Sequence, residues 1–316
     1  MMGLQLKRKG NIPVVALREI ADVPYMAFPA LDATGVVLHG FSTRLGGVSQ
    51  GDCATMNFAG GRGDDPANIC ENYRRMAVAI GFDPEKIVLS YQTHTTNIRK
   101  VTVEDMGKGY DRERDYQDID GLITDVPGAV LVTSYADCVP LLFVDPVRKA
   151  IGASHSGWRG TVARMGRCTV EAMKEAYGCH PEDLIVAIGP SICQDCYEVS
   201  EDVAEAFAKE LGLTLPVEER MLDADPSVGQ RTENDSIPSI IKKTPGKPGK
   251  YQLDLQLANV QILTEAGVLP EHISVTDVCT CCNKDMIFSH RGSQGRRGNM
   301  GAFLCLKENI FVDGSK

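Results

Sequence analysis

Residues 131–160, which read LVTSYADCVPLLFVDPVRKAIGASHSGWRG, constrain the fold of this chain more than any other segment. They contain two short, apolar, β-rich runs at 139–144 and 149–155. Runs of this kind predict buried strands of a central sheet, and their spacing lets the chain go out along one strand and return along the next. Cys138 and His155 then lie at equivalent ends of two strands, where a sheet gathers distant side chains at one edge.

These two residues and a third, His94 in Tyr-Gln-Thr-His, are candidate metal ligands. Two imidazoles and one thiolate form a three-ligand zinc set, and a fourth position left to water distinguishes catalytic from structural zinc. Taken singly, a histidine near a strand end or a buried cysteine is more often an ordinary packed residue. Three such residues, each beside glycine, aspartate or arginine, favour a zinc site instead.

Two carboxylates are candidates for orienting those ligands or a bound water. Asp137 directly precedes Cys138, and Asp120 lies in the run DIDGLIT. Carboxylates commonly accept a hydrogen bond from the second ring nitrogen of a metal-bound histidine. An Asx turn at Asp120, which precedes a glycine, is the simpler structural interpretation of that residue.

Apolar periodicity and turn residues predict the remaining elements. Asp65 and Pro66 form an N-cap and a first helical position, and Gly81 ends that helix. Helices are expected over 65–80, 161–177, 200–211 and 253–267, and strands over 36–44, 86–92, 97–103, 129–135, 184–190, 273–280 and 302–307. The proline-rich segment 214–250 is expected to be an insertion or mobile loop. Because strands and helices mix without a regular βαβ rhythm, the predicted class is α+β.

Composition limits the class of protein. With 316 residues, of which 43% are hydrophobic, the chain can bury one large core or two small ones. No apolar run is long enough to span a membrane, and the first residues lack a signal-peptide pattern, so a cytoplasmic protein without membrane partners is expected. The net charge of −9 argues against nucleic acid as a partner but allows a small anion in a local arginine pocket.

Eleven cysteines in so long a chain favour free thiols and metal ligands over a disulfide scaffold. Two Cys-x-x-Cys pairs, Cys193 with Cys196 and Cys279 with Cys282, are of the type found in four-cysteine zinc sites. Their separation of about eighty residues exceeds the compact spacing of zinc-ribbon modules. Free thiols near the core are therefore the favoured interpretation, with a second metal site or a functional dithiol as the alternative.

Arginines beside glycines form a second group of candidates. A guanidinium next to glycine lets charged and backbone N–H donors converge on one phosphate. Arg44 and Arg159 are the strongest candidates, because the first precedes Gly-Gly and the second precedes a predicted helix start, whose positive end attracts anions. Arg291 follows Phe-Ser-His, whereas Arg296 and Arg297 are expected to be solvated surface residues.

Ten motifs, in order along the chain, resemble the pattern of the YfiH-like, or laccase-domain, family: FSTRLGGVS, NFA, QTH, DIDGLIT, ADCVPLLFVD, ASHSGWRG, GPSICQDCYEV, LDLQLANVQIL, CTCC and FSHRG. The resemblance covers about residues 36–306. It implies one domain over 1–316 with α/β/β/α layers, and zinc bound by His94, Cys138 and His155. It also implies purine nucleoside chemistry: phosphorolysis of adenosine, inosine, guanosine or methylthioadenosine, and deamination of adenosine.

The predicted site contains further residues beside the metal ligands. Asp137, Arg159 and His290 are the predicted catalytic residues, and Arg44, Asn57, Asp120 and Arg291 are predicted to bind substrate. Two positions depart from the family pattern: His-Ser-Gly-Trp replaces His-Ala-Gly-Trp, and Ser-His-Arg-Gly replaces Ser-Tyr-Arg-Arg. One arginine is thus absent, and His290 is either an acid/base group or a packed residue.

The expected mechanism uses a zinc-activated water to attack C6 of adenine, with Asp137 as proton shuttle, while Arg44 and Arg159 hold phosphate near the ribose C1′. One alternative is an amide hydrolase with Cys138 as nucleophile and His155 as base, which would suit the peptidoglycan-editing role described for some bacterial members. Another is a non-catalytic metal-dependent binding protein. A copper polyphenol oxidase is disfavoured, because the six histidines form no His-x-His pair. The preferred purine, the leading reaction and the oligomeric state stay open.

Overall fold

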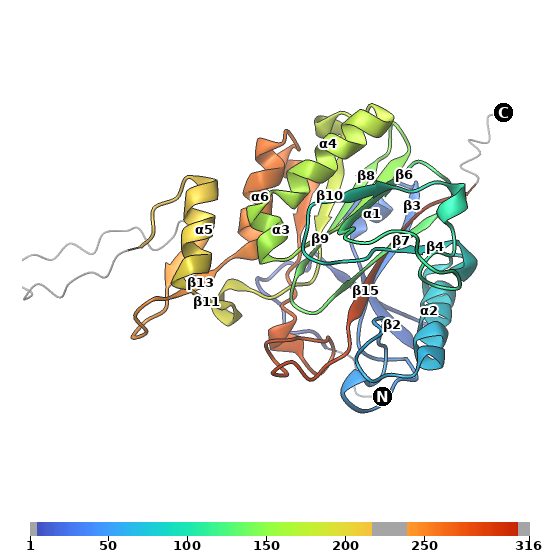
Figure 1. The fold of residues 1–316 in the computed structure, drawn as a ribbon, viewed down its shortest axis with the longest axis horizontal. Helices are drawn as coiled ribbons and strands as arrows, with labels where there is room; N and C mark the ends of the chain where they lie inside the picture. The colour runs from blue at the N-terminus through green and yellow to red at the C-terminus, as the bar shows by residue number, and fades with distance from the viewer. Residues whose placement is uncertain (1–4, 217–238, 309–316) are drawn as a thin grey trace, which may run out of the picture.

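The computed structural model describes residues 5–216 and 239–308 and is built around two six-stranded sheets (Figure 1). In spatial order, the first sheet contains β1 (Ala16–Ile20), β2 (Val23–Ala27), β3 (Val37–Ser42), β15 (Met300–Leu306), β7 (Val130–Tyr135) and β4 (Ile87–Leu89). The second contains β14 (Ile273–Val275), β10 (Ile185–Ile188), β8 (Val139–Asp145), β9 (Ala150–Ser156), β6 (Gly121–Thr124) and β5 (Ile98–Lys100).

A third, small sheet and six α-helices complete the described part of the chain. The small sheet contains β11 (Glu198–Ser200), β13 (Lys250–Leu253) and β12 (Ile241–Lys243). The helices are α1 (Pro29–Asp32), α2 (Pro66–Ile80), α3 (Trp158–Val162), α4 (Met165–Tyr177), α5 (Glu201–Leu211) and α6 (Leu255–Glu265). None of the helices in the described ranges is long and apolar enough to cross a membrane.

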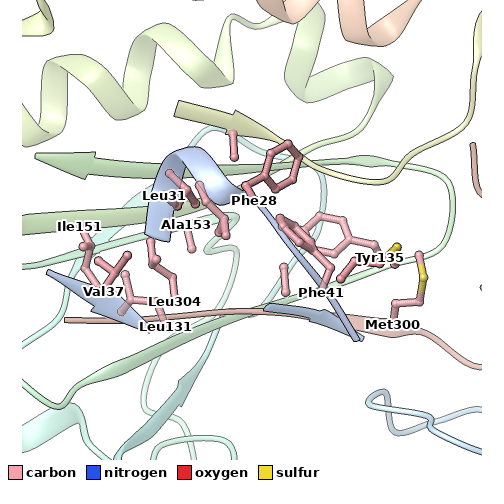
Figure 2. Close-up of a cluster of buried hydrophobic side chains, with 14 of the residues drawn as sticks. Phe28, Leu31, Val37, Phe41, Leu131, Tyr135, Ile151, Ala153, Met300 and Leu304 are labelled. Carbon is pink, nitrogen blue, oxygen red and sulfur yellow. The ribbon is translucent and has the colours of Figure 1, made fainter. Parts of the chain in front are cut away.

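The two large sheets face each other across the main hydrophobic core. In Figure 2, Leu131 and Leu304 of the first sheet lie in one cluster with Ile151 and Ala153 of the second. All four side chains are fully buried. Their strands β7, β9 and β15 are buried along almost their whole length, as expected for strands that are covered on both faces.

Side chains that alternate in direction along the strands also form apolar clusters on the outer faces of the two large sheets. Val130 and Val132 of β7 belong to the cluster beneath α2, whereas Leu131 between them belongs to the core between the sheets. Successive side chains of a strand point to opposite faces, so one apolar strand serves two cores. On the second sheet, α4 packs against β9 and α6 packs against α4. The predicted α+β class is confirmed, while the strict order of four layers and the single domain stay predictions.

Several local predictions are confirmed and others are wrong. Helix α2 begins after Asp65, whose side chain accepts a hydrogen bond from the Ala67 N–H, and it ends at Gly81 with a φ of 95°. The helix predicted over 161–177 starts earlier, at Trp158, and is broken into α3 and α4 by Arg164, which has a φ of 60°. The Arg164 guanidinium binds carboxylates on the neighbouring helices, which holds this conformation.

The segment 214–250 was expected to be an insertion or mobile loop. Residues 217–238 lie outside the described part of the chain, but 241–243 and the following 250–253 form strands of the small sheet. These strands pair antiparallel with each other, and β13 also pairs with β11. The mobile-loop alternative therefore does not hold for 241–243, because pairing with another strand outweighs the local proline and glycine content, while the insertion stays a prediction.

Candidate metal centre and active site

The crossing between the two sheets positions Cys138. Strand β7 ends at Tyr135 in the first sheet, and β8 begins at Val139 in the second, so Cys138 lies in the short link between them. Strand β8 pairs antiparallel with β9, and Pro140 lies opposite His155. The predicted arrangement, with both side chains at one end of a two-strand ladder, is confirmed.

His94 comes from the loop between β4 and β5 and completes the group. One potential ligand atom from each of His94, Cys138 and His155 lies within 4.8 Å of the other two. The two imidazole rings meet edge to face, with centroids 4.9 Å apart. His155 is buried, Cys138 is half-buried and His94 is exposed, so the group opens to solvent on the His94 side. Three protein ligands with one accessible side is the arrangement typical of catalytic zinc.

Asp120 holds the two histidines in place. Its Oδ1 lies 2.8 Å from Nδ1 of His155, which leaves Nε2 of that ring for a metal. Both carboxylate oxygens also accept backbone N–H groups of the His94 loop, at 3.0 Å from Thr93, 3.1 Å from His94 and 2.9 Å from Thr95. Asp120 has no exposed surface. Its carboxylate thus holds both histidines in place, and its predicted contact with substrate stays a prediction.

Charges within the group favour the ligand form of the cysteine. Burial opposes ionisation of the Cys138 thiol, yet His155 and His94 lower its pKa to about 6. Against the effect of burial, Cys138 and Asp120 in turn raise the pKa of His155. The thiolate is the form that binds metals and the form that acts as a nucleophile. The donor set therefore suits a soft or borderline cation such as zinc.

Backbone conformation at the site also distinguishes it from ordinary strand ends. His94 has a φ of 69° and Asp137 a φ of 86°, in the left-handed region that L-residues seldom adopt. Such conformations persist where surrounding contacts enforce them, and they are frequent at functional sites. For Asp137 those contacts come from Thr280 Oγ1 and from the Arg291 N–H, each donating to the carboxylate at 2.6 Å.

Tyr197 is an aromatic neighbour of Arg291 that the motif-bearing sequence had not singled out as a site residue. Arg291 lies over the Tyr197 ring at 5.3 Å, and it donates to the Glu198 carbonyl at 2.9 Å. Tyr197 also interacts electrostatically with Arg159 and with Cys138. The signal available in the sequence was the motif that contains Tyr197, GPSICQDCYEV.

The other predicted binding residues are engaged within the protein. The Arg44 guanidinium donates to the carbonyls of Ala54 and Lys284 and lies over the Phe288 ring at 4.6 Å. Asn57 is fully buried, and its amide bonds to Asp64 and to backbone groups. The direct contact of both residues with substrate stays a prediction.

The C-terminal arginine pair differs from expectation in one member. Arg296 is exposed and pairs with Asp52 at 3.1 Å, as expected for a surface residue. Arg297 is half-buried, and its Nε is buried without a hydrogen-bond partner. It also lies 3.4 Å from Nδ1 of His290, which is exposed. Burial and then Arg297 lower the pKa of His290, so this imidazole is neutral at physiological pH.

Together these features define an α+β protein with one His-Cys-His group, open to solvent and bordered by arginines. The chain belongs to the family described as multi-copper polyphenol oxidoreductase laccase, whose model matches residues 38–307. It is 35% identical to the purine nucleoside phosphorylase YlmD of Bacillus subtilis over 276 residues, which cover 86% of this chain and 89% of the relative.

A second relative carries a different activity in its name. Adenosine deaminase RL5, from an unknown prokaryotic organism, is 30% identical over 79% of this chain and 87% of its own length. The crystal structure of YlmD from Geobacillus stearothermophilus superposes with a TM-score of 0.76 at 32% identity, covering 92% of this chain and 99% of that one. The family resemblance found in the sequence is confirmed, and so is the prediction that the chain is an enzyme.

Proposed function

We propose that this chain is a zinc-dependent purine nucleoside enzyme, which catalyses phosphorolysis of adenosine, inosine, guanosine and methylthioadenosine and deamination of adenosine. The observation that carries the proposal is the His94, Cys138 and His155 group, whose ligand atoms lie within 4.8 Å of one another and open to solvent at His94. Relatives named as a phosphorylase and as a deaminase support both reactions.

The residues around the group fit a zinc ion. Asp120 fixes the orientation of His155, and Gly157 keeps the space beside the three side chains free. A zinc ion, when bound, supplies Lewis-acid activation of water or of a substrate oxygen. Asp137, next to Cys138 in the chain, is proposed to accept and return the proton at its carboxylate during deamination.

For phosphorolysis, phosphate is proposed to bind between Arg159 and Arg291, both of which interact with Tyr197. Arg159 is exposed and lies over the Trp158 ring at 4.3 Å, so its guanidinium is free to turn toward an anion. Arg297 is proposed as a further anion contact because its Nε has no partner. His290, neutral at physiological pH, is proposed to donate or accept a proton at the departing purine.

One alternative rests on a specific observation. The lowered pKa of Cys138 and its contact with His155 also suit a cysteine nucleophile with a histidine base, as in an amide hydrolase that edits peptidoglycan precursors. A copper oxidase with several copper ions has less support, because within the described residues only one metal-ligating group contains histidine. A thiolate bound to a metal is a poor nucleophile. The metal content of the purified protein therefore distinguishes the zinc enzyme from the cysteine hydrolase.

The test combines metal analysis with a chromatographic assay of adenosine, with and without phosphate. Cys138→Ala is expected to lose the zinc of this site together with both activities, because one of three protein ligands is gone. Cys70→Ser, which changes an exposed thiol on α2, is the matched control and should leave zinc and turnover unchanged. Full zinc retention in Cys138→Ala would refute the ligand assignment. Alkylation of Cys138 in a metal-free wild type without purine turnover would favour the hydrolase.

Phosphate binding is tested separately with Arg159→Ala and Arg44→Ala. The first is expected to raise the KM for phosphate by about tenfold, the effect of one lost charge-assisted contact, while leaving deamination intact. If Arg44→Ala alone raises that KM, phosphate binds on the Arg44 side instead. An unchanged phosphate dependence in both variants would contradict the proposed anion site.

A further inference from the structure

Four cysteines outside the candidate active site form a second compact group, named here the four-cysteine cluster. One sulfur from each of its members lies within 4.8 Å of the other three: Cys193, Cys196, Cys279 and Cys282. The sulfurs of Cys196 and Cys282 are 3.5 Å apart, and the Cys193 N–H donates to the Cys279 sulfur at 3.3 Å. No disulfide joins them.

The topology of the second sheet brings the two pairs together. Strands β10 and β14 are parallel neighbours, with Val186 opposite Ile273. The pairing continues beyond both strands through a bridge between Ser191 and Cys279. Each strand therefore runs into its Cys-x-x-Cys turn at the same end of the sheet. The two pairs are about eighty residues apart in sequence, which had favoured free thiols. They are close in space because the intervening chain leaves the sheet and returns as β14 beside β10.

The geometry of the four-cysteine cluster matches a tetrahedral metal site. A zinc–sulfur distance of about 2.3 Å places tetrahedral sulfur ligands about 3.8 Å apart, within the span observed here. Cys193 and Cys279 are buried, each 2% exposed, whereas Cys196 and Cys282 are accessible, so the site lies at the protein surface with an entry path. Both pairs have the x-x spacing typical of structural zinc.

We propose that the four-cysteine cluster binds a second metal ion, a structural zinc held by four thiolates. Each thiol releases its proton to solvent as its sulfur binds. Because the protein supplies all four ligands, no position stays open for substrate, which distinguishes this site from the His-Cys-His group. The inference does not depend on the purine nucleoside proposal.

Charged neighbours support this assignment. Four thiolates and one zinc ion carry a net negative charge, which a nearby cation stabilises. The Lys9 ammonium interacts electrostatically with the Cys193 thiol and lies 3.1 Å from the Asp195 carboxylate. Lys9 belongs to the N-terminal segment, which is itself held here by the hydrogen bond from its N–H to the Asp277 carbonyl at 2.7 Å.

The cluster also borders the residues that hold Asp137. Ile192, which precedes Cys193, donates its N–H to the Asp137 carbonyl at 3.0 Å. Thr280, which follows Cys279, donates to the Asp137 carboxylate at 2.6 Å. A zinc ion that crosslinks the two turns would thereby keep Asp137, and the adjacent Cys138, in their observed places. The proposed second zinc thus stabilises the geometry of the His-Cys-His group without being part of that group.

The experiment counts zinc by mass spectrometry in the purified full-length chain and its variants. About two zinc ions per chain are expected in the wild type and about one in Cys282→Ser, which changes an accessible ligand. Cys138→Ala should also hold about one, and the double variant none. Cys281→Ser is the matched control, because Cys281 lies between two cluster members in sequence but is not one of them. It should retain the wild-type zinc content.

A second measurement covers the case in which Cys282→Ser fails to fold. Zinc-edge X-ray absorption of Cys138→Ala, whose cluster is intact, should show only sulfur ligands at about 2.3 Å. Nitrogen or oxygen ligands in that spectrum, iron in place of zinc, or a Cys196–Cys282 disulfide found by peptide mapping of the wild type would each overturn the proposal. Unchanged zinc content in a folded Cys282→Ser would do so as well.

Discussion

Gly157 occupies the position at which all three side chains of the His-Cys-His group converge. A Cβ at this position would lie 3.0 Å from Cδ2 of His94 and 3.1 Å from the Cys138 sulfur. Both distances are tighter than ordinary van der Waals contact, and neither neighbour is free to move without leaving the group. The glycine in the Ser-Gly-Trp run is therefore explained by close approach of side chains rather than by an unusual φ.

Gly157→Ala is expected to reduce zinc occupancy and purine turnover together, because the added methyl group displaces His94 or Cys138 from the ligand position. Circular dichroism should show an unchanged fold, since the clash is confined to the site. Gly60→Ala is the control, because a Cβ at that position meets nothing within 4 Å. Wild-type zinc content in Gly157→Ala would contradict this expectation, because it would show that the three side chains still bind zinc beside the added methyl group.

Among single elements, the edge strand β5 is joined to the turn that follows it by a small charge network. Arg99 on β5 donates to Asp105 at 2.6 Å, and Lys108 donates to the same oxygen at 2.8 Å. Asp105 is 2% exposed. Although burial by itself raises the pKa of this carboxyl, the hydrogen bonds from Arg99 and Lys108 lower it to about 2.

This network predicts a pH-dependent contribution to stability. The folded pKa of Asp105 lies below the unfolded value of about 3.9, so the carboxylate contributes fully above pH ~4 and its contribution is lost as the pH falls toward 2. Asp105→Asn should lower the free energy of unfolding by about 2 kcal/mol at pH 7, with the difference from wild type shrinking between pH ~4 and ~2. Urea unfolding across that pH range measures it. Glu113→Gln, at an exposed position in the neighbouring loop, should show no such convergence.

Elements were predictable where local signals agree with the tertiary structure. The N-cap at Asp65, the first-turn proline and Gly81 set the limits of α2 correctly. The break between α3 and α4 was not predictable, because Arg164 has ordinary helix propensity. Its left-handed conformation is held by Glu210 and Glu265, which come from other helices.

At the scale of the whole molecule, the two sheets are held together by the apolar core between them. Leu304 of β15 is fully buried in this core, and Figure 2 shows it close to Leu131. Leu304→Ala should lower the free energy of unfolding by about 2–5 kcal/mol, the usual cost of removing a buried leucine side chain. Equilibrium urea unfolding of the metal-loaded protein measures this cost. A loss below about 1 kcal/mol would mean that the sheets close over the cavity.

The sequence by itself determined the mixed class, most strands, and the meeting of Cys138 with His155, because adjacent antiparallel strands place such residues at one edge. It also indicated Asp120 as a candidate orienting carboxylate, with an Asx turn as the simpler alternative. The tertiary structure alone decided which polar groups are already satisfied. Arg44 was a candidate anion ligand on local pattern, yet distant carbonyls occupy its guanidinium.

The four-cysteine cluster was also decided by the tertiary structure alone. Its pairs follow β10 and β14, and only the parallel pairing of these strands brings the sulfurs together. Periodicity and spacing report on neighbours in sequence, because helix and strand geometry is local. Which strands become neighbours in a sheet depends on how the whole apolar surface is buried, and that information is spread over the entire chain.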